Sequence, residues 1–312
     1  MSKCLYCYKE SGEADFHPAC ARRFFGSETV PELPYTRENM SELAKKVIRA
    51  STSVTGVQAK MSLDIDRGKK NEPARFTIVG LWGRYILKPQ SHQYPHLPEL
   101  EDLTMKMAEV AGISAAKHTL IRLADGELAY LTRRMDRGSR GEKISMLDFC
   151  QLSNRLTEHK YYGTYPQLAD TVKRFSSAPL LDVQRFWEVV LFSWITGNSD
   201  MHCKNFSLLD LGGREYSLSP AYDLLPVLLA DPLDQEEMAL TFTVGGEKAG
   251  FGRETFLAAF RESSIPEGVA QRMLNRPEQL LPAWEELIDM SFLPERVKSS
   301  YKALLEDRIG RL

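Results

Sequence analysis

The stretch 183–196 constrains the fold more than any other part of the chain. Read as a helix, it is apolar on nearly every face and therefore has to be surrounded by other elements. Gly197 ends the pattern, and the polar segment Asn198–Asn205 follows at once. The sequence predicts a central buried helix with polar side chains at its carboxyl end. The apolar positions are Phe186, Val189, Val190, Phe192, Trp194 and Ile195.

The polar segment holds Asp200 and Asn205 in the order D-x-x-x-x-N, the spacing of a kinase catalytic loop. In such a loop the Asp accepts the proton of the attacking hydroxyl group, and the Asn oxygen binds magnesium. A hairpin predicted at 206–218 leads to Asp223, whose carboxylate could hold the other side of the metal. Alternatively, these are ordinary turn and loop residues. Their place after a buried helix and around a hairpin favours the kinase interpretation.

The bulk composition fits a globular protein of two lobes. The chain has 312 residues, of which 43% are hydrophobic, and its formal charge of −2 gives no basic surface for free-standing DNA binding. The most apolar run, 186–196, is too short to cross a bilayer. Five cysteines and no apolar leader segment fit a reducing compartment. We therefore expect a cytoplasmic protein that does not enter a membrane.

Residues 1–35 are expected to form an irregular N-terminal arm. They contain two pairs of residues, Cys4-x2-Cys7 and His17-x2-Cys20, that could make a four-ligand zinc knuckle. Cys and His in pairs suit the tetrahedral coordination of Zn²⁺. The alternative is that these are small buried residues in an arm tucked against the protein.

A helix predicted at 36–49 leads to a hydroxyl-rich turn and then to a strand with strict alternation at 61–65. Such a turn can offer backbone N–H groups to phosphates, although it matches neither the Walker motif nor G-x-G-x-x-G. By itself it also fits a plain β-turn. The candidate phosphate-binding residues are Ser53, Val54, Thr55 and Gly56.

Two more strands are predicted at 76–79 and 84–87, and Lys88 ends the second. An apolar strand that ends in Lys is where a kinase-like lobe places its phosphate-pairing lysine, although exposed lysines at strand ends are common. Pro98 opens a helix with Glu101 in its first turn. Glu101 could pair with Lys88 there, or could simply interact favourably with the helix dipole.

A hairpin predicted at 119–132 runs into Arg133-Arg134-Met135 and a glycine-rich break at 138–141. In a two-lobed kinase this is the hinge, where the chain meets the adenine of the nucleotide, so Arg133 and Met135 are candidate nucleotide contacts. The lobe boundary is expected near residue 135. The expected domains are an arm at 1–35, an N-lobe at 36–135 and a C-lobe at 136–312.

The C-lobe is predicted to be helical except for the hairpin after residue 205 and a short strand at 239–243. Its helices are expected at 147–152, 165–175, 183–196, 253–263, 267–275, 277–290 and 294–309.

Together these segments resemble the HipA family of bacterial toxin kinases. The resemblance covers roughly residues 40 to 310, and it is specific because several separated motifs agree in order. The motifs are the turn and strand 53–63, Ile86-Leu87-Lys88-Pro89, the segment 94–101, the hinge 134–137, the loop 197–205 and Ala221-Tyr222-Asp223.

The resemblance implies an α+β, two-lobed fold of the PI3/4-kinase-like kind, with a small β-rich N-lobe and a large, mostly helical C-lobe. It also implies a serine/threonine kinase that uses ATP and Mg²⁺. The family pattern places Asp200, His202 and Lys204 in the catalytic loop, and it places Asn205 and Asp223 at the metal.

The resemblance further implies regulation and partners. Ser53 matches the family's regulatory serine and Thr55 matches a second hydroxyl of short, HipT-type members, so both are expected sites of autophosphorylation. Short members lack an N-terminal subdomain, which is supplied by a separate small protein. A helix-turn-helix antitoxin would hold the toxin and link it to DNA. The family's targets are aminoacyl-tRNA synthetases.

Two other functions remain open: a small-molecule phosphotransferase, and a pseudokinase corepressor that acts only within an antitoxin–DNA complex. The presence of Lys88, Asp200, Asn205 and Asp223 counts against the corepressor. The hydroxyl-rich turn favours a protein kinase over a small-molecule kinase, because a phosphorylatable phosphate loop is a means of self-regulation.

Overall fold

The chain divides into two compact units. A computed structural model describes residues 2–40, 43, 60–68, 72–79, 82–138, 140–213, 215–231 and 234–312. The first unit comprises Met1–Asp102, Ala116–Glu142 and Met290–Leu293. The second unit comprises Leu103–Ala115, Lys143–Asp289 and Pro294–Leu312. The helix α3 (Leu97–Val110) thus contains one of the points at which the chain passes from one unit to the other.

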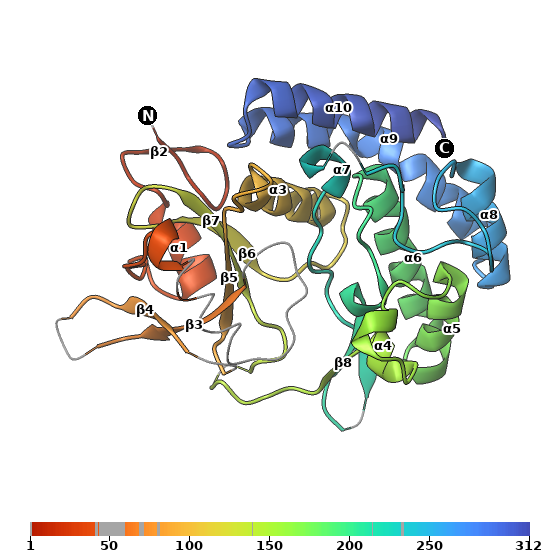
Figure 1. Cartoon of the computed structure of the whole chain (residues 1–312), viewed down its shortest axis with the longest axis horizontal. Coiled ribbons are helices and arrows are strands. Elements are labelled where there is room, and N and C mark those ends of the chain that lie inside the picture. Colours follow the sequence, from red (N-terminus) through yellow and green to blue (C-terminus); the bar gives the residue numbers. More distant parts are fainter. Residues whose placement is uncertain are drawn as a thin grey trace. The chain divides into compact units, whose positions relative to one another are not determined.

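The first unit is built on a five-stranded antiparallel sheet in the order β4-β3-β5-β7-β6 (Figure 1). Alternation places Met61 and Leu63 in the core, as the sequence pattern predicts. The tight turn at Asp125-Gly126 sets the register of the last hairpin, in which Arg122 lies opposite Leu128. The strands are β3 (Met61–Asp66), β4 (Arg75–Ile78), β5 (Tyr85–Pro89), β6 (His118–Arg122) and β7 (Leu128–Arg133).

The prediction of an irregular N-terminal arm is wrong. The arm contains two short paired strands, β1 (Ser2–Lys3) and β2 (Glu10–Gly12), and the helix α1 (Pro18–Phe25). Pro18 suits the first turn of a helix because its missing N–H would have no partner there. Gly26 ends the helix in the left-handed conformation, with φ of 78°.

Two aromatic residues of α1 attach the arm to the sheet. The ring of Phe24 lies 6.2 Å from that of Tyr85 on β5, and the ring of Phe25 lies 6.2 Å from that of Phe76 on β4. Both phenylalanines are buried. Of the helix predicted at 36–49, residues 36–40 and 43 are described; residues 37–40 and 43 are helical, and Thr36 precedes the helix.

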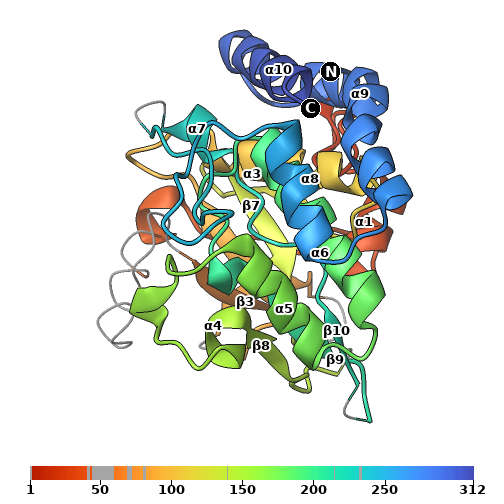
Figure 2. The same ribbon diagram turned by 90° about the vertical axis from the view of Figure 1, so that its right-hand side faces the viewer.

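The second unit surrounds α6 (Pro179–Ile195), the buried helix that the sequence predicts. Phe186, Trp187 and Trp194 are among its fully buried side chains. The helix α5 (Tyr165–Phe175) runs beside α6, as Figure 2 shows. The predicted helix at 165–175 is therefore confirmed, and the apolar faces of α6 are covered as their composition requires.

A three-stranded antiparallel sheet in the order β10-β9-β8 carries the predicted hairpin, with β9 at Ser207–Asp210 and β10 at Tyr216–Leu218. The helix predicted at 147–152 is wrong in its first half, where β8 (Met146–Asp148) pairs with β9. The helix α4 starts only after Asp148, because that side chain forms a capping box with Gln151. The helix α4 comprises Phe149–Leu152, and the short 3₁₀ turns η1 and η2 comprise Thr157–His159 and Cys203–Asn205.

The two helices predicted on either side of residue 276 are one helix, α9 (Glu267–Met290), with Pro277 and Pro282 inside it. Its buried residues continue at helical spacing through Pro277, so packing along one face outweighs the proline's cost of about 3 kcal/mol. The buried positions are Ala270, Met273, Leu274, Pro277, Trp284 and Ile288. The remaining helices are α7 (Val227–Ala230), α8 (Arg253–Glu262) and α10 (Glu295–Gly310).

The strand predicted at 239–243 does not form. The backbone there makes a single bridge, between Thr164 and Thr241. Leu240 and Phe242 are buried, but so is their neighbour Ala239, and the Phe242 ring contacts Tyr165 and Phe251. Burial therefore does not alternate along the segment as it would on one face of a sheet.

Candidate functional site

Gly197 makes the turn from α6 into the polar loop. Its φ of 74° is left-handed, where residues with a Cβ are strained. A Cβ at this position would also approach a side-chain carbon of Leu304 to 2.7 Å. The Leu304 side chain could move aside, but the left-handed backbone favours glycine strongly and fixes the direction in which the loop leaves the buried helix.

Asp200 lies in this loop with its side chain 48% exposed, so its carboxylate can reach a substrate. The Tyr161 hydroxyl donates a hydrogen bond of 2.7 Å to Asp200 Oδ1. Burial, together with this bond to a carboxylate, raises the pKa of Tyr161 well above its ordinary value, so the hydroxyl remains a donor. The sequence analysis missed Tyr161, because a tyrosine 39 residues before its partner carries no recognisable spacing.

His202 is buried behind Asp200, with its Nε2 4.0 Å from Asp200 Oδ2. Burial lowers the pKa of His202, although the Asp200 carboxylate opposes that effect. The edge of the ring meets Tyr161 at a centroid separation of 5.1 Å. His202 is thus a neutral side chain at neutral pH that packs beneath the loop. Its predicted catalytic role stays a prediction.

Lys204 holds the loop to the neighbouring sheet. Its Nζ lies 2.5 Å from Asp148 Oδ2, at the end of β8. The Tyr222 hydroxyl donates to the Lys204 carbonyl oxygen at 2.8 Å and meets the Ser207 hydroxyl at 2.6 Å. Neither Asp148 nor Tyr222 was singled out as a partner of the loop from the sequence. Together they join the loop to the segment that carries Asp223.

The loop also orients the two predicted metal ligands. The Asn205 amide nitrogen donates to the Asp200 carbonyl oxygen at 3.0 Å, which leaves Oδ1 as the atom that would face a metal. The Asn198 amide nitrogen lies 3.4 Å from the Asp223 carbonyl oxygen. Asp223 itself has φ of 55°, a conformation rare outside glycine and common at functional sites.

The chemistry of these two side chains fits Mg²⁺. One carboxylate and one amide oxygen are hard ligands, and Mg²⁺ typically takes one or two carboxylates together with substrate phosphates and waters. Asn205 and Asp223 would therefore be the residues of this chain that hold the ion.

In the first unit, Lys88 and Glu101 form a buried ion pair. Their side-chain atoms Nζ and Oε1 lie 2.5 Å apart, and the residues are 4% and 1% exposed. The Tyr130 ring lies beneath the ammonium group, with its centroid 5.4 Å away. Of the two possibilities for Glu101, the pair with Lys88 is the one that forms, and Lys88 is not an exposed strand-end lysine.

Other predicted nucleotide contacts are less constrained. Ser53, Val54, Thr55 and Gly56 lie outside the described residues. Arg133 ends β7 opposite Tyr85, and its backbone N–H donates to Lys117. Met135 follows in the segment predicted as the hinge, where it is half-buried. The roles of these residues at the nucleotide stay predictions.

The four predicted zinc ligands in the arm come together. The candidate ligand atoms of Cys4, Cys7, His17 and Cys20 all lie within 4.8 Å of one another. This places two pairs, nine residues apart in the sequence, around one point in the first unit.

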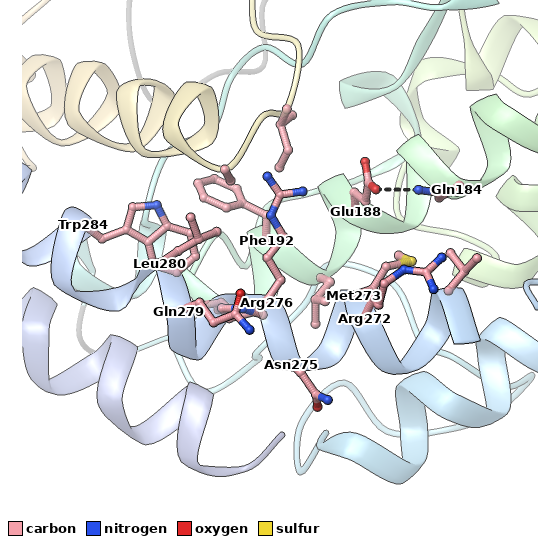
Figure 3. Close-up of a pocket in the computed structure, with 16 residues that line it drawn as sticks. Gln184, Glu188, Phe192, Arg272, Met273, Asn275, Arg276, Gln279, Leu280 and Trp284 are labelled. Atoms are coloured by element: carbon pink, nitrogen blue, oxygen red, sulfur yellow. Dashed lines mark hydrogen bonds between the residues drawn. The ribbon is translucent and has the colours of Figure 1, made fainter. Parts of the chain in front are cut away.

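A pocket of about 460 Å³ lies in the second unit between α6 and α9 (Figure 3). Phe192, Leu280 and Trp284 make its apolar part, while Arg272 and Arg276 bring positive charge. None of the predicted site residues lines it. The predicted catalytic loop therefore lies elsewhere in this unit.

Among the described residues, no helix combines the length and the apolar character that a membrane span requires.

Comparisons with known proteins agree with these observations. Residues 52–284 match the model of the HipA-like C-terminal domain. A Haemophilus influenzae protein that carries the name Putative kinase is 24% identical over 290 residues, which are 85% of this chain and 82% of that protein. The serine/threonine-protein kinase toxin HipA of Shewanella oneidensis is 29% identical over 203 residues, or 59% of this chain and 45% of the toxin.

The fold is also that of a solved HipA structure. The Shewanella oneidensis HipA chain, solved in a complex with HipB and operator DNA, superposes with a TM-score of 0.67 at 22% identity. The match covers 96% of this chain and 80% of that one. The expected α+β, kinase-like fold is therefore confirmed. Since the family model covers most of the sequence, the chain belongs to the family of HipA-like C-terminal domain proteins.

Proposed function

We propose that this protein is a serine/threonine protein kinase that uses ATP and Mg²⁺ and acts as the toxin of a toxin–antitoxin pair. One observation carries the proposal: each unit retains its part of a kinase's polar machinery. The first unit has the buried pair Lys88–Glu101, and the second has Asp200 and Asn205 in a loop held from several sides. The presence of both counts against a pseudokinase.

The residues have distinct tasks in this proposal. Asp200 accepts the proton of the substrate hydroxyl while the hydroxyl oxygen attacks the γ-phosphorus of ATP and ADP leaves, and Tyr161 fixes the orientation of that carboxylate. Asn205 and Asp223 hold Mg²⁺, which neutralises charge on the phosphate oxygens when bound. Lys88 pairs with the phosphates of ATP, and Glu101 keeps the ammonium group in place.

The biological setting is proposed from the family. The Shewanella relative is a named kinase toxin, and its solved structure contains HipB and operator DNA. By analogy, a helix-turn-helix antitoxin binds this chain and connects it to DNA. Phosphorylation of an aminoacyl-tRNA synthetase would stall translation. Autophosphorylation at Ser53 or Thr55 would add about −1.5 to −2 charge beside the nucleotide and switch the kinase off.

The test is intact-mass spectrometry after incubation of the purified chain with ATP and Mg²⁺. The proposal predicts added phosphate on the protein, and peptide mapping should place it at residues 51–55. Substitution of both Ser53 and Thr55 by alanine should remove that label. Hydrolysis of ATP without protein phosphorylation would instead favour a small-molecule phosphotransferase. No reaction of any kind would favour the corepressor.

Toxicity is tested separately, by expression without the antitoxin. The wild-type chain should arrest growth, and extracts of the arrested cells should contain a phosphorylated aminoacyl-tRNA synthetase. Asp200→Asn should be tolerated. Equal tolerance of both chains would argue against a toxin kinase.

A further inference from the structure

The N-terminal arm folds around a group of thiols and one imidazole. Cys4 and Cys7 lie in the turn between β1 and β2, while His17 and Cys20 lie at the start of α1. His17 Nδ1 is 3.4 Å from the Cys7 sulfur and 3.8 Å from the Cys20 sulfur. The kinase proposal uses none of these four side chains.

These spacings match the edges of a tetrahedral zinc site. With Zn–S bonds of about 2.3 Å and Zn–N bonds of about 2.0–2.1 Å, neighbouring ligand atoms stand roughly 3.5–3.8 Å apart. The two nitrogen–sulfur distances lie close to that range, and no pair of candidate ligand atoms is separated by more than 4.8 Å. Only small side-chain movements are needed to place an ion at the centre.

The imidazole is set in the tautomer that a metal requires. His17 Nε2 lies 2.8 Å from the carbonyl oxygen of Glu10, which can only accept, so Nε2 carries the proton. The lone pair is therefore on Nδ1, the atom that faces the sulfurs. A ligand histidine almost always donates its other N–H to a carbonyl or carboxylate in this way.

Cys4 is fully buried, whereas Cys7, His17 and Cys20 are half-buried. The three cysteines form no disulfide with one another. A disulfide between two of them would also not account for the imidazole nitrogen that faces the sulfurs.

We propose that Cys4, Cys7, His17 and Cys20 bind one structural Zn²⁺ ion. Four protein ligands fill the tetrahedral coordination of the ion and leave no position for a substrate, so its task is to hold the arm. The site does not depend on the kinase proposal, because its evidence lies entirely in the arm.

The ion would act on the rest of the first unit through Tyr8. This residue follows Cys7 and has a left-handed φ of 65°, a conformation that needs support in a residue with a large side chain. Its hydroxyl donates to Asp102 Oδ2 at 2.6 Å, and Asp102 Oδ1 lies 2.7 Å from His118 Nδ1. Asp102 is the residue after Glu101 on α3. The zinc-bound turn therefore anchors the part of α3 that carries the partner of Lys88.

The first test is the metal content of the full-length protein, purified under reducing conditions without chelator. Elemental analysis should find about one zinc per chain. Cys20→Ser and His17→Ala should each reduce the zinc content several-fold. The control, Cys150→Ala, replaces a buried cysteine of the second unit and should retain the zinc.

The second test uses the wild-type chain, so it does not depend on whether a variant folds. Bound zinc should protect Cys4, Cys7 and Cys20 from alkylation, and a strong chelator should expose all three together. Substitution with Co²⁺ should give the intense visible absorption of a tetrahedral thiolate site. A metal-free protein whose melting temperature responds to neither zinc nor chelator would overturn the proposal. So would a disulfide among these cysteines, or a metal other than zinc in the purified chain.

Discussion

The proposed zinc knuckle at residues 4–20 and the proposed catalytic loop at residues 197–205 are both short, polar and largely irregular, yet they are held in different ways. The knuckle's candidate ligands all come from one stretch of the arm. The loop is held by partners scattered along the second unit, and these partners are Asp148, Tyr161, Tyr165, Tyr222 and Asp234. The knuckle can therefore form from one short stretch of sequence, whereas the loop is held only once the whole second unit has folded.

This difference has energetic consequences. A structural zinc site contributes an apparent binding energy of about 10–16 kcal/mol in small peptides, and loss of one ligand can remove most of it. The loop depends on separate hydrogen bonds, each with a net contribution of about 0.5–1.5 kcal/mol. We therefore expect the loss of one zinc ligand to unfold the whole knuckle. The loss of one hydrogen bond should destabilise the loop only in part.

The largest effect is expected at Asp200, the loop residue that we propose to act on the substrate. Asp200→Asn should lower kcat about 10²–10⁴-fold, because the amide cannot accept the hydroxyl proton. The melting temperature and the ATP affinity should change little, since Asp200 is half-exposed and is not a proposed metal ligand. Steady-state kinetics and calorimetry measure these quantities. Asp170→Asn, an exposed carboxylate on α5, is the matched control, and near wild-type turnover by Asp200→Asn would refute the catalytic assignment.

The next effect tests whether the knuckle fails as a whole. Cys20→Ser should greatly increase amide hydrogen exchange throughout residues 4–25 and at the start of α3, where Tyr8 meets Asp102. Exchange in the catalytic loop should stay as in the wild-type chain. Mass spectrometry of exchanged peptides gives both results. Cys150→Ala should leave the arm protected, and a change confined to the residues around Cys20 would show that the arm has no cooperative metal site.

A smaller, graded effect is expected from a single hydrogen bond of the loop. Tyr161→Phe removes the donor to Asp200 and should lower kcat about 2–10-fold, which corresponds to roughly 0.5–1.4 kcal/mol. The KM for ATP should not change, because the hydroxyl does not touch a proposed metal ligand. Tyr162→Phe, an exposed neighbour, serves as the control. A loss as large as that of Asp200→Asn would mean that the loop, too, fails as a unit.

The smallest effect concerns how the free energy of unfolding depends on acidic pH. Burial lowers the pKa of His202 below the value of about 6.5 that it has in an unfolded chain. As the pH falls through 6.5, the unfolded state takes up a proton before the folded state does, so this part of the stability is present above pH 6.5 and is lost below it. Denaturant unfolding at several pH values should show a shallower decline for His202→Asn. The same slope in both proteins would mean that His202 titrates normally.

Features of the fold and the site could be predicted where the interacting residues are close in the sequence, and not where they are far apart in it. The buried helix, the strands of the first unit and the D-x-x-x-x-N loop are visible because their signals are periodic or closely spaced. Tyr161 and Asp148 could not be found, because their partners are tens of residues away and their identity depends on how β8 meets β9. The single helix α9 was missed because prolines are strong local signals, while the burial that overrides them is tertiary.

The contacts of the arm also have a consequence for the order in which the protein can form during synthesis. The proposed zinc ligands all lie within residues 4–20, so the knuckle can close around an ion soon after Cys20 leaves the ribosome. The hydrogen bonds of the arm can form only after its partners have been synthesised. These bonds join Tyr8 to Asp102, the Leu5 carbonyl to Thr119, and Lys3 to the Met290 carbonyl. The knuckle can thus form well before its contacts with the rest of the first unit are complete, since contacts between residues far apart in the sequence form slowly. A nascent chain stalled before Met290 would carry a folded arm that has not completed its docking.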